Sequence, residues 1–202
     1  MPTVAAIRSR AKSIARELRS DPAALIAHAT KLALNGNEQL AFELFRAAPK
    51  TAATITIKQV ERLLPALHDW NSTDCFGSFV SGVAWREGSL TDEHIVAWTR
   101  SKNLWTRRAA LVSTVPLNLN ARGSKAPKGE AKKTILICER LVDDHEDMIV
   151  KALSWALRTL APKDPAAVRA FLTHHEPRLA ARVLRETRNK LKTGLKNPKQ
   201  LP

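Results

Sequence analysis

Apolar residues along this 202-residue chain recur at steps of three and four positions, the spacing that places side chains on one face of an α-helix. Four such stripes run through residues 57–67, 76–83, 104–115 and 149–160. The second comprises Phe76, Phe79, Val80 and Val83, and the fourth comprises Ile149, Ala152, Leu153, Ala156 and Leu160. Alternating runs of β-branched residues, which are typical of strands, are nearly absent. The pattern therefore predicts an all-α protein.

Short breaks divide the chain into about ten or eleven predicted helices of roughly 10 to 18 residues. Helix pairs recur at roughly 35 to 45 residues, the range of HEAT and armadillo repeats, although the sequence itself shows no clean repeat. A helical bundle would have the same periodicity. We favour an all-α, α-solenoid architecture of HEAT-like helical repeats with a basic concave face, forming a single domain over residues 1–195.

The net charge of the chain indicates what kind of partner it binds. Lysine and arginine number 33 against 19 acidic residues, which gives a formal net charge of +14. Such a surplus repels itself within a compact fold and indicates a polyanion, for which nucleic acid is the first candidate. An anionic membrane surface, an acidic protein or a generic basic protein would fit the same count. No apolar run approaches the roughly 18 residues of a membrane span, so we expect no membrane insertion.

Two parts of the chain concentrate the positive charge. Residues 119–133 also contain glycine and proline and predict a basic flexible loop, while the last helix carries cations at helical spacing on one face. Residues 196–202 predict a disordered basic tail. These cations are either phosphate contacts, which their number favours, or a solvated surface. The candidate contacts are Lys125, Lys128, Lys132, Lys133, Arg182 and Arg185.

One tryptophan departs from the helical pattern. Trp155 points some 130° (a rough value from about 100° per residue) away from the apolar stripe of residues 149–160. Lys151 and Arg158 flank it at minus four and plus three. An aromatic ring between cations is a candidate for contact with a nucleotide, and burial against a neighbouring repeat is the equally weighted alternative.

A second tryptophan is paired with a carboxylate. If residues 70–74 are helical, Trp70 and Asp74 share one face, opposite the stripe of residues 76–83. In the structural alternative, which this segment alone favours, Asn71 or Ser72 caps the helix and Asp74 suits the dipole of its first turn.

A charge also falls inside an apolar stripe. Arg108 lies four residues after Leu104 and three before Leu111, whereas Arg107 lies to the side. A guanidinium at that position needs a partner or a groove, because an unpaired buried charge is costly. An ordinary structural ion pair is slightly favoured over a functional role.

The two cysteines, Cys75 and Cys138, stand apart with no paired spacing for a metal site. They indicate reduced thiols in a cytoplasmic protein, here nucleoid-associated if DNA is the partner.

Taken in order, three segments resemble the AlkD-type HEAT-like-repeat DNA alkylation-repair glycosylases: Trp70-Asn71-Ser72-Thr73-Asp74, residues 103–111 and residues 151–158. The resemblance covers roughly residues 16–190. It implies helical repeats whose basic concave face holds duplex DNA, with Trp70, Asp74, Arg108 and Trp155 as active-site residues. Arg107, Lys151 and Arg158 are then further candidate DNA contacts.

The implied reaction removes cationic N3- or N7-alkylated purines, with neither a metal nor a cofactor. Asp74 would stabilise the positive sugar and orient a water, Trp70 and Trp155 would wall the site, and Arg108 would hold a phosphate. The family is thought to act without a base-reading pocket. Family members usually begin with an extra helical stretch, so we expect this chain to start near the second repeat, and its 119–133 loop looks long.

Three functions remain open from sequence. The first is a monomeric glycosylase acting on alkylated duplex DNA, which the set of four site residues favours. The second is a non-catalytic HEAT-like protein that binds damaged, bent or branched DNA, which the short start favours. The third is a solenoid scaffold for an acidic protein, and steep weakening of binding by salt would exclude it.

Overall fold

The computed structural model describes residues 2–119 and 130–198, and every regular element among them is helical. The predicted all-α class is confirmed, and the helix order is compatible with an α-solenoid of helical repeats. The chain forms two compact units, residues 1–95 and 96–202, and the two are described separately below. A single domain over residues 1–195 therefore stays a prediction.

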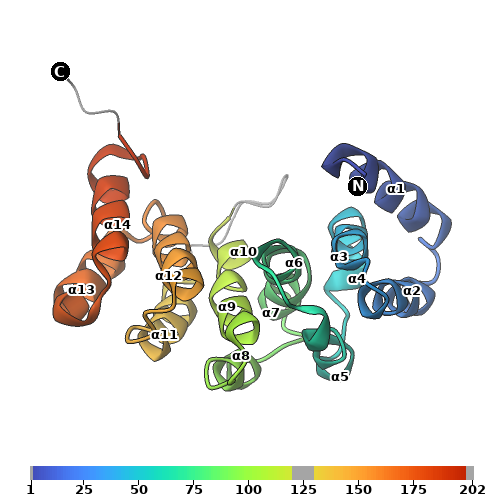
Figure 1. The fold of residues 1–202 in the computed structure, drawn as a ribbon, viewed down its shortest axis with the longest axis horizontal. Helices are drawn as coiled ribbons and strands as arrows, with labels where there is room; N and C mark the ends of the chain where they lie inside the picture. Colours follow the sequence, from blue (N-terminus) through green and yellow to red (C-terminus); the bar gives the residue numbers. More distant parts are fainter. Residues whose placement is uncertain (1, 120–129, 199–202) are drawn as a thin grey trace. The chain divides into compact units, whose positions relative to one another are not determined.

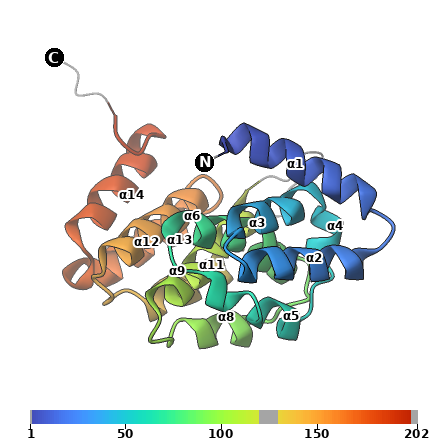
Figure 2. The same ribbon diagram turned by 45° about the vertical axis from the view of Figure 1, so that its right-hand side comes forward.

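The first unit is built around helix α3, which contacts both α1 and α6 (Figures 1 and 2). The apolar side chains of α3 are buried on almost every side, and its Phe42 ring meets Phe76 of α6 edge-on with 5.6 Å between ring centroids. The elements are α1 (Val4–Glu17), α2 (Pro22–Leu34), α3 (Glu38–Ala47), α4 (Pro49–Ala52), α5 (Ile57–Glu61), η1 (Leu64–Ala66), α6 (Trp70–Phe76), η2 (Gly77–Ser81) and α7 (Gly82–Arg86).

Residues 70–86 form one helical segment with a wider turn in its middle. Helix α6 runs into the π-helical turn η2, which runs into α7, and Gly77 and Gly82 at the junctions keep right-handed helical dihedral angles. A π turn adds a residue to the helical period, so side chains after it no longer follow the expected stripe. Phe79, predicted on the apolar face, is accordingly only half-buried, while Phe76 and Val80 are buried.

The second unit is built around helix α12, which packs against both α9 and α14 (Figures 1 and 2). Its stripe Ile149, Leu153, Ala156 and Leu160 is fully buried, as the sequence pattern predicts. Helix α8 (Asp92–Trp98) spans the boundary between the units. The other elements are α9 (Leu104–Val112), α10 (Val115–Asn118), α11 (Ala131–Arg140), α12 (Asp147–Leu160), α13 (Pro165–His175), η3 (Glu176–Arg178) and α14 (Ala181–Thr193).

Side chains and prolines at the helix starts explain several boundaries. Asp21 accepts a hydrogen bond from the backbone N–H of Ala24 at 2.9 Å, and Asp164 does the same for Ala167 at 2.9 Å. Each aspartate is followed by a proline, which lacks the N–H that a first helical position leaves unpaired.

Three predictions of local structure need correction. The stripe of residues 57–67 is not one helix, because it is split into α5 and η1 and Pro65 cannot donate within a helix. The predicted loop 119–133 overlaps α11, so Lys132 and Lys133 are helical, whereas Lys125 and Lys128 lie outside the described residues. The start of the predicted tail is ordered against α14, since Lys196 Nζ lies 3.3 Å from Glu186 Oε1.

Candidate functional site

Helix α6 presents an aromatic ring and a carboxylate one turn apart. Asp69 caps the helix by accepting a hydrogen bond from Ser72 N at 2.6 Å, so neither Asn71 nor Ser72 is the cap. Trp70 is the first helical residue and is 56% exposed, which makes it the one large exposed aromatic side chain in the described part of the chain. Asp74 follows four residues later and is partly buried.

Charged groups from two other helices surround the residue after Asp74. Burial, followed by the carboxylates of Glu43 and Asp74, raises the pKa of Cys75 to about 12, and Arg8 and Arg46 oppose this rise. The charge of Asp74 therefore acts on the same thiol as the charges that α1 and α3 supply. The sequence analysis missed Arg8, Glu43 and Arg46. The signal for Glu43 was an acidic residue inside the apolar run of α3.

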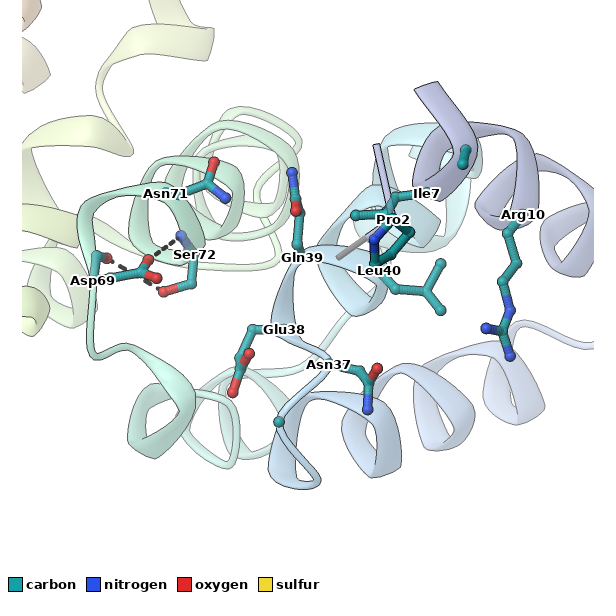
Figure 3. A pocket seen from close by; sticks show the side chains of 12 residues that line it. Pro2, Ile7, Arg10, Asn37, Glu38, Gln39, Leu40, Asp69, Asn71 and Ser72 are labelled. Carbon is teal, nitrogen blue, oxygen red and sulfur yellow. Dashed lines mark hydrogen bonds between the residues drawn. The ribbon is translucent and has the colours of Figure 1, made fainter. Parts of the chain in front are cut away.

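A cavity of about 540 Å³ opens beside the first turns of α3 and α6 (Figure 3). Asn37, Gln39 and Asn71 offer amide groups at its wall, and Arg10 of α1 adds one cation. Neither Trp70 nor Asp74 is among its lining residues, so this cavity is no base pocket over the carboxylate. The complete lining is Pro2, Ala6, Ile7, Arg10, Gly36, Asn37, Glu38, Gln39, Leu40, Asp69, Asn71 and Ser72.

In the second unit, Arg108 ties α9 to α12. It is only 5% exposed, and its Nη1 donates to the backbone carbonyl of Met148 in the first turn of α12. The guanidinium on the apolar stripe thus finds a partner inside the protein, as its burial requires. That partner is the backbone carbonyl oxygen of a residue in the neighbouring helix, so Arg108 joins two helices.

Trp155 lies half-buried on α12, between its two flanking cations. Lys151 Nζ is 2.6 Å from Asp147 Oδ2, and Arg182 Nη1 of α14 is 3.2 Å from Asp147 Oδ1. The hydrogen bond from Lys151 is the main reason that the pKa of Asp147 is lowered.

Arg158, one turn beyond Trp155, takes part in a buried network. Its Nε donates to Ser154 Oγ at 3.1 Å and lies 3.6 Å from Glu186 Oε2 of α14. Burial lowers the pKa of Arg158, and the charge of Glu186 opposes this change. The cation predicted to contact DNA therefore also holds α12 to α14.

The remaining predicted contacts fall into two groups. Arg107 Nε lies 2.7 Å from Asp144 Oδ2, and its Nη1 donates to the carbonyls of Ser101 and Lys102 at 3.0 Å each. By contrast, no ion pair joins Lys132 or Arg185 to another described residue, and both side chains are exposed.

Within residues 2–119 and 130–198, no three histidine, cysteine, aspartate or glutamate side chains gather closely enough to hold a metal ion. Across the same residues, no helix has the length and apolar character needed to cross a bilayer.

Comparison with known proteins gives one match. The sequence profile of a family described as DNA alkylation repair enzyme matches residues 3–191. No curated protein and no solved structure matches the chain significantly.

Proposed function

The chain belongs to the DNA alkylation repair enzyme family, and we propose that it is a DNA glycosylase. The proposed reaction hydrolyses the N-glycosidic bond of cationic N3- or N7-alkylated purines in duplex DNA. The observation that carries the proposal is the exposed ring of Trp70, one helical turn before the carboxylate of Asp74. The net charge of +14 supports a polyanionic substrate.

The proposed chemistry needs no strong acid. As the bond between C1′ and the purine nitrogen breaks, its electron pair passes to the base, which leaves neutral because it was already positive. Positive charge develops on the sugar, and the carboxylate of Asp74 stabilises it. Water adds to C1′ and loses its proton to Asp74 or to solvent. The face of Trp70 attracts the cationic base before cleavage.

Roles in the second unit follow from local contacts there. We propose that Trp155 stacks against a sugar or base, since it is half-buried and carries a cation on each side. Arg108 supports this surface by fixing α9 to α12 through Met148, and an amino group of its guanidinium is proposed to contact a phosphate.

Exposed cations without acidic partners are the stronger candidates for phosphate contact. Lys132 and Arg185 can exchange only water and counterions for a phosphate, which favours binding. Arg107, Lys151, Arg158 and Arg182 must also give up or share a carboxylate, so each is proposed to contribute less.

The testing experiment measures release of 7-methylguanine and 3-methyladenine from methylated duplex DNA by the wild type, Asp74→Asn and Glu61→Gln. Glu61 is an exposed carboxylate in the same unit and serves as the matched control. We expect Asp74→Asn to lower the single-turnover rate by about 100-fold or more, with nearly unchanged DNA affinity, and Glu61→Gln to behave as wild type.

Two outcomes would redirect the proposal. Equal loss of rate and affinity in Asp74→Asn would give Asp74 a binding role in place of a catalytic one. No release by the wild type, together with tight and salt-sensitive DNA binding, would favour the alternative of a non-catalytic protein for damaged, bent or branched DNA.

A further inference from the structure

A buried carboxylate in the first unit binds two arginines at once. The side chain of Glu43 in α3 is only 2% exposed. Arg8 Nε of α1 lies 3.0 Å from Glu43 Oε1, and Arg46 Nε of α3 donates to Glu43 Oε2. Each oxygen of the carboxylate therefore fixes one guanidinium, and the two guanidiniums are held on either side of one anchor.

Both arginines keep binding capacity beyond this contact. Each uses Nε towards Glu43, and the terminal amino groups of Arg8 and Arg46 form no hydrogen bond with any described residue. The side chains are 48% and 35% exposed, so those groups are accessible to a ligand. Arg46 is further restrained because its guanidinium carbon lies 5.8 Å from the centroid of the Phe79 ring.

Two guanidinium groups share the single carboxylate of Glu43, so Glu43 itself neutralises only one of the two positive charges. Phe79 lies in η2, which continues helix α6, and Cys75 of α6 is influenced by Glu43, Asp74 and both arginines. Arg46 thus contacts the same helical segment that carries Asp74.

We propose that Arg8 and Arg46, positioned by Glu43, form a clamp for one phosphodiester group of a DNA strand. The clamp rests on the proposed function and adds to it a binding position for one phosphate of the DNA substrate. Guanidinium groups match the geometry of phosphate oxygens, and restraining them before binding lowers the entropy lost on binding. A phosphate held here also fixes the register of the strand relative to Asp74, so the clamp is a positioning site.

The key variant is Arg46→Ala, since Arg8 then still partners the buried carboxylate and the fold is kept. Arg16→Ala is the matched control, because Arg16 is an exposed arginine of α1 with no ion pair among the described residues. The ligand is a duplex with one 2′-fluoro-7-methylguanosine, whose fluorine opposes positive charge on the sugar and prevents cleavage during the measurement. A series of duplexes replaces one phosphate at a time by a neutral methylphosphonate.

For the wild type, we expect one methylphosphonate position in this series to weaken binding by about tenfold. Arg46→Ala should bind the unmodified duplex about tenfold more weakly than the wild type does, and the slope of log affinity against log salt should be lower in magnitude by about 0.9. The methylphosphonate at the sensitive position should then weaken the binding of Arg46→Ala no further. Arg16→Ala should keep the sensitivity of the wild type. Circular dichroism checks the fold, and Arg46→Lys, which keeps the charge but not the fork, should also lose the position-specific effect.

An unchanged methylphosphonate profile in Arg46→Ala and Arg46→Lys, with a normal wild-type affinity, would overturn the clamp and leave the proposed function intact. A wild type that binds the duplex weakly and without salt dependence would instead overturn the proposed function, and the clamp with it.

Discussion

The buried network between α12 and α14 predicts a large stability difference between two glutamates of the same unit. The side chain of Glu186 is 6% exposed, and its Oε2 accepts a hydrogen bond from the fully buried Ser154 hydroxyl at 2.7 Å. Arg158 and Lys196 pair with the same carboxylate. Replacing Glu186 by alanine removes all of these contacts together.

The expected loss follows from the exposure of each partner. A buried hydroxyl left without an acceptor costs about 1–3 kcal/mol. Breaking a fully buried ion pair costs about 3–5 kcal/mol. Arg158 is 18% and Lys196 46% exposed, however, so water can solvate both cations in the variant and offsets most of that cost. We therefore expect Glu186→Ala to lower the free energy of unfolding by about 3 kcal/mol, which for a chain of this size lowers the Tm by roughly 6–12 °C.

The matched control is Glu176→Ala. Glu176 pairs with Arg188 of α14 at 2.7 Å, but the two side chains are 50% and 52% exposed. An exposed pair contributes about 0–1 kcal/mol, so this variant should unfold at nearly the urea concentration of the wild type. Urea titrations followed by circular dichroism measure both. Equal and small losses for the two variants would refute the assignment of stability to the buried network.

Two further predictions concern titration. Burial raises the pKa of Glu186, but the hydrogen bond from Ser154 and the nearby cations outweigh burial, so the pKa lies below the ordinary 4.5. The ionised carboxylate therefore stabilises the fold fully above pH 4.5. This stabilisation is lost as the pH falls through the lowered pKa. The stability gap between wild type and Glu186→Gln should shrink in urea titrations below about pH 4.5, and a constant gap would contradict this. Burial raises the pKa of both Cys75 and Cys138. Iodoacetamide at pH 8 should therefore label these thiols slowly in the folded protein and fast in the urea-unfolded protein. Rapid labelling of the folded protein would contradict this, because it would show accessible thiolates.

The sequence predicts the helices well where the apolar period is long and unbroken. The stripe of residues 149–160 corresponds closely to α12, because nothing interrupts its hydrogen-bond ladder. It predicts them poorly where the ladder changes. Pro65 removes a donor, and the π turn at residues 77–81 shifts the period, which moves Phe79 off the apolar face and under Arg46.

The same division holds for the candidate site. The exposure of Trp70 could be expected from helical spacing, since it depends on its own helix. One partner of Arg108 is a carbonyl 40 residues away, and Arg8 and Glu43 are 35 residues apart. Such pairs depend on how helices pack, and a spacing rule within one helix cannot identify them. An acidic residue within the apolar run of α3 predicts that a partner exists but not which one.

Ion pairing also changes how the positive charge should be counted. The surplus of 33 cations over 19 acids is a property of the whole chain. Among the described residues, however, the predicted DNA contacts Arg107, Lys151, Arg158 and Arg182 are each paired with a carboxylate. Arg158 and Arg182 also join α12 to α14. Replacing them changes the stability of the second unit as well as any contact with DNA. The salt slope should therefore follow the exposed, unpaired Lys132 and Arg185 more closely than the total charge, and affinity changes at the paired positions become interpretable only alongside unfolding data for the same variants.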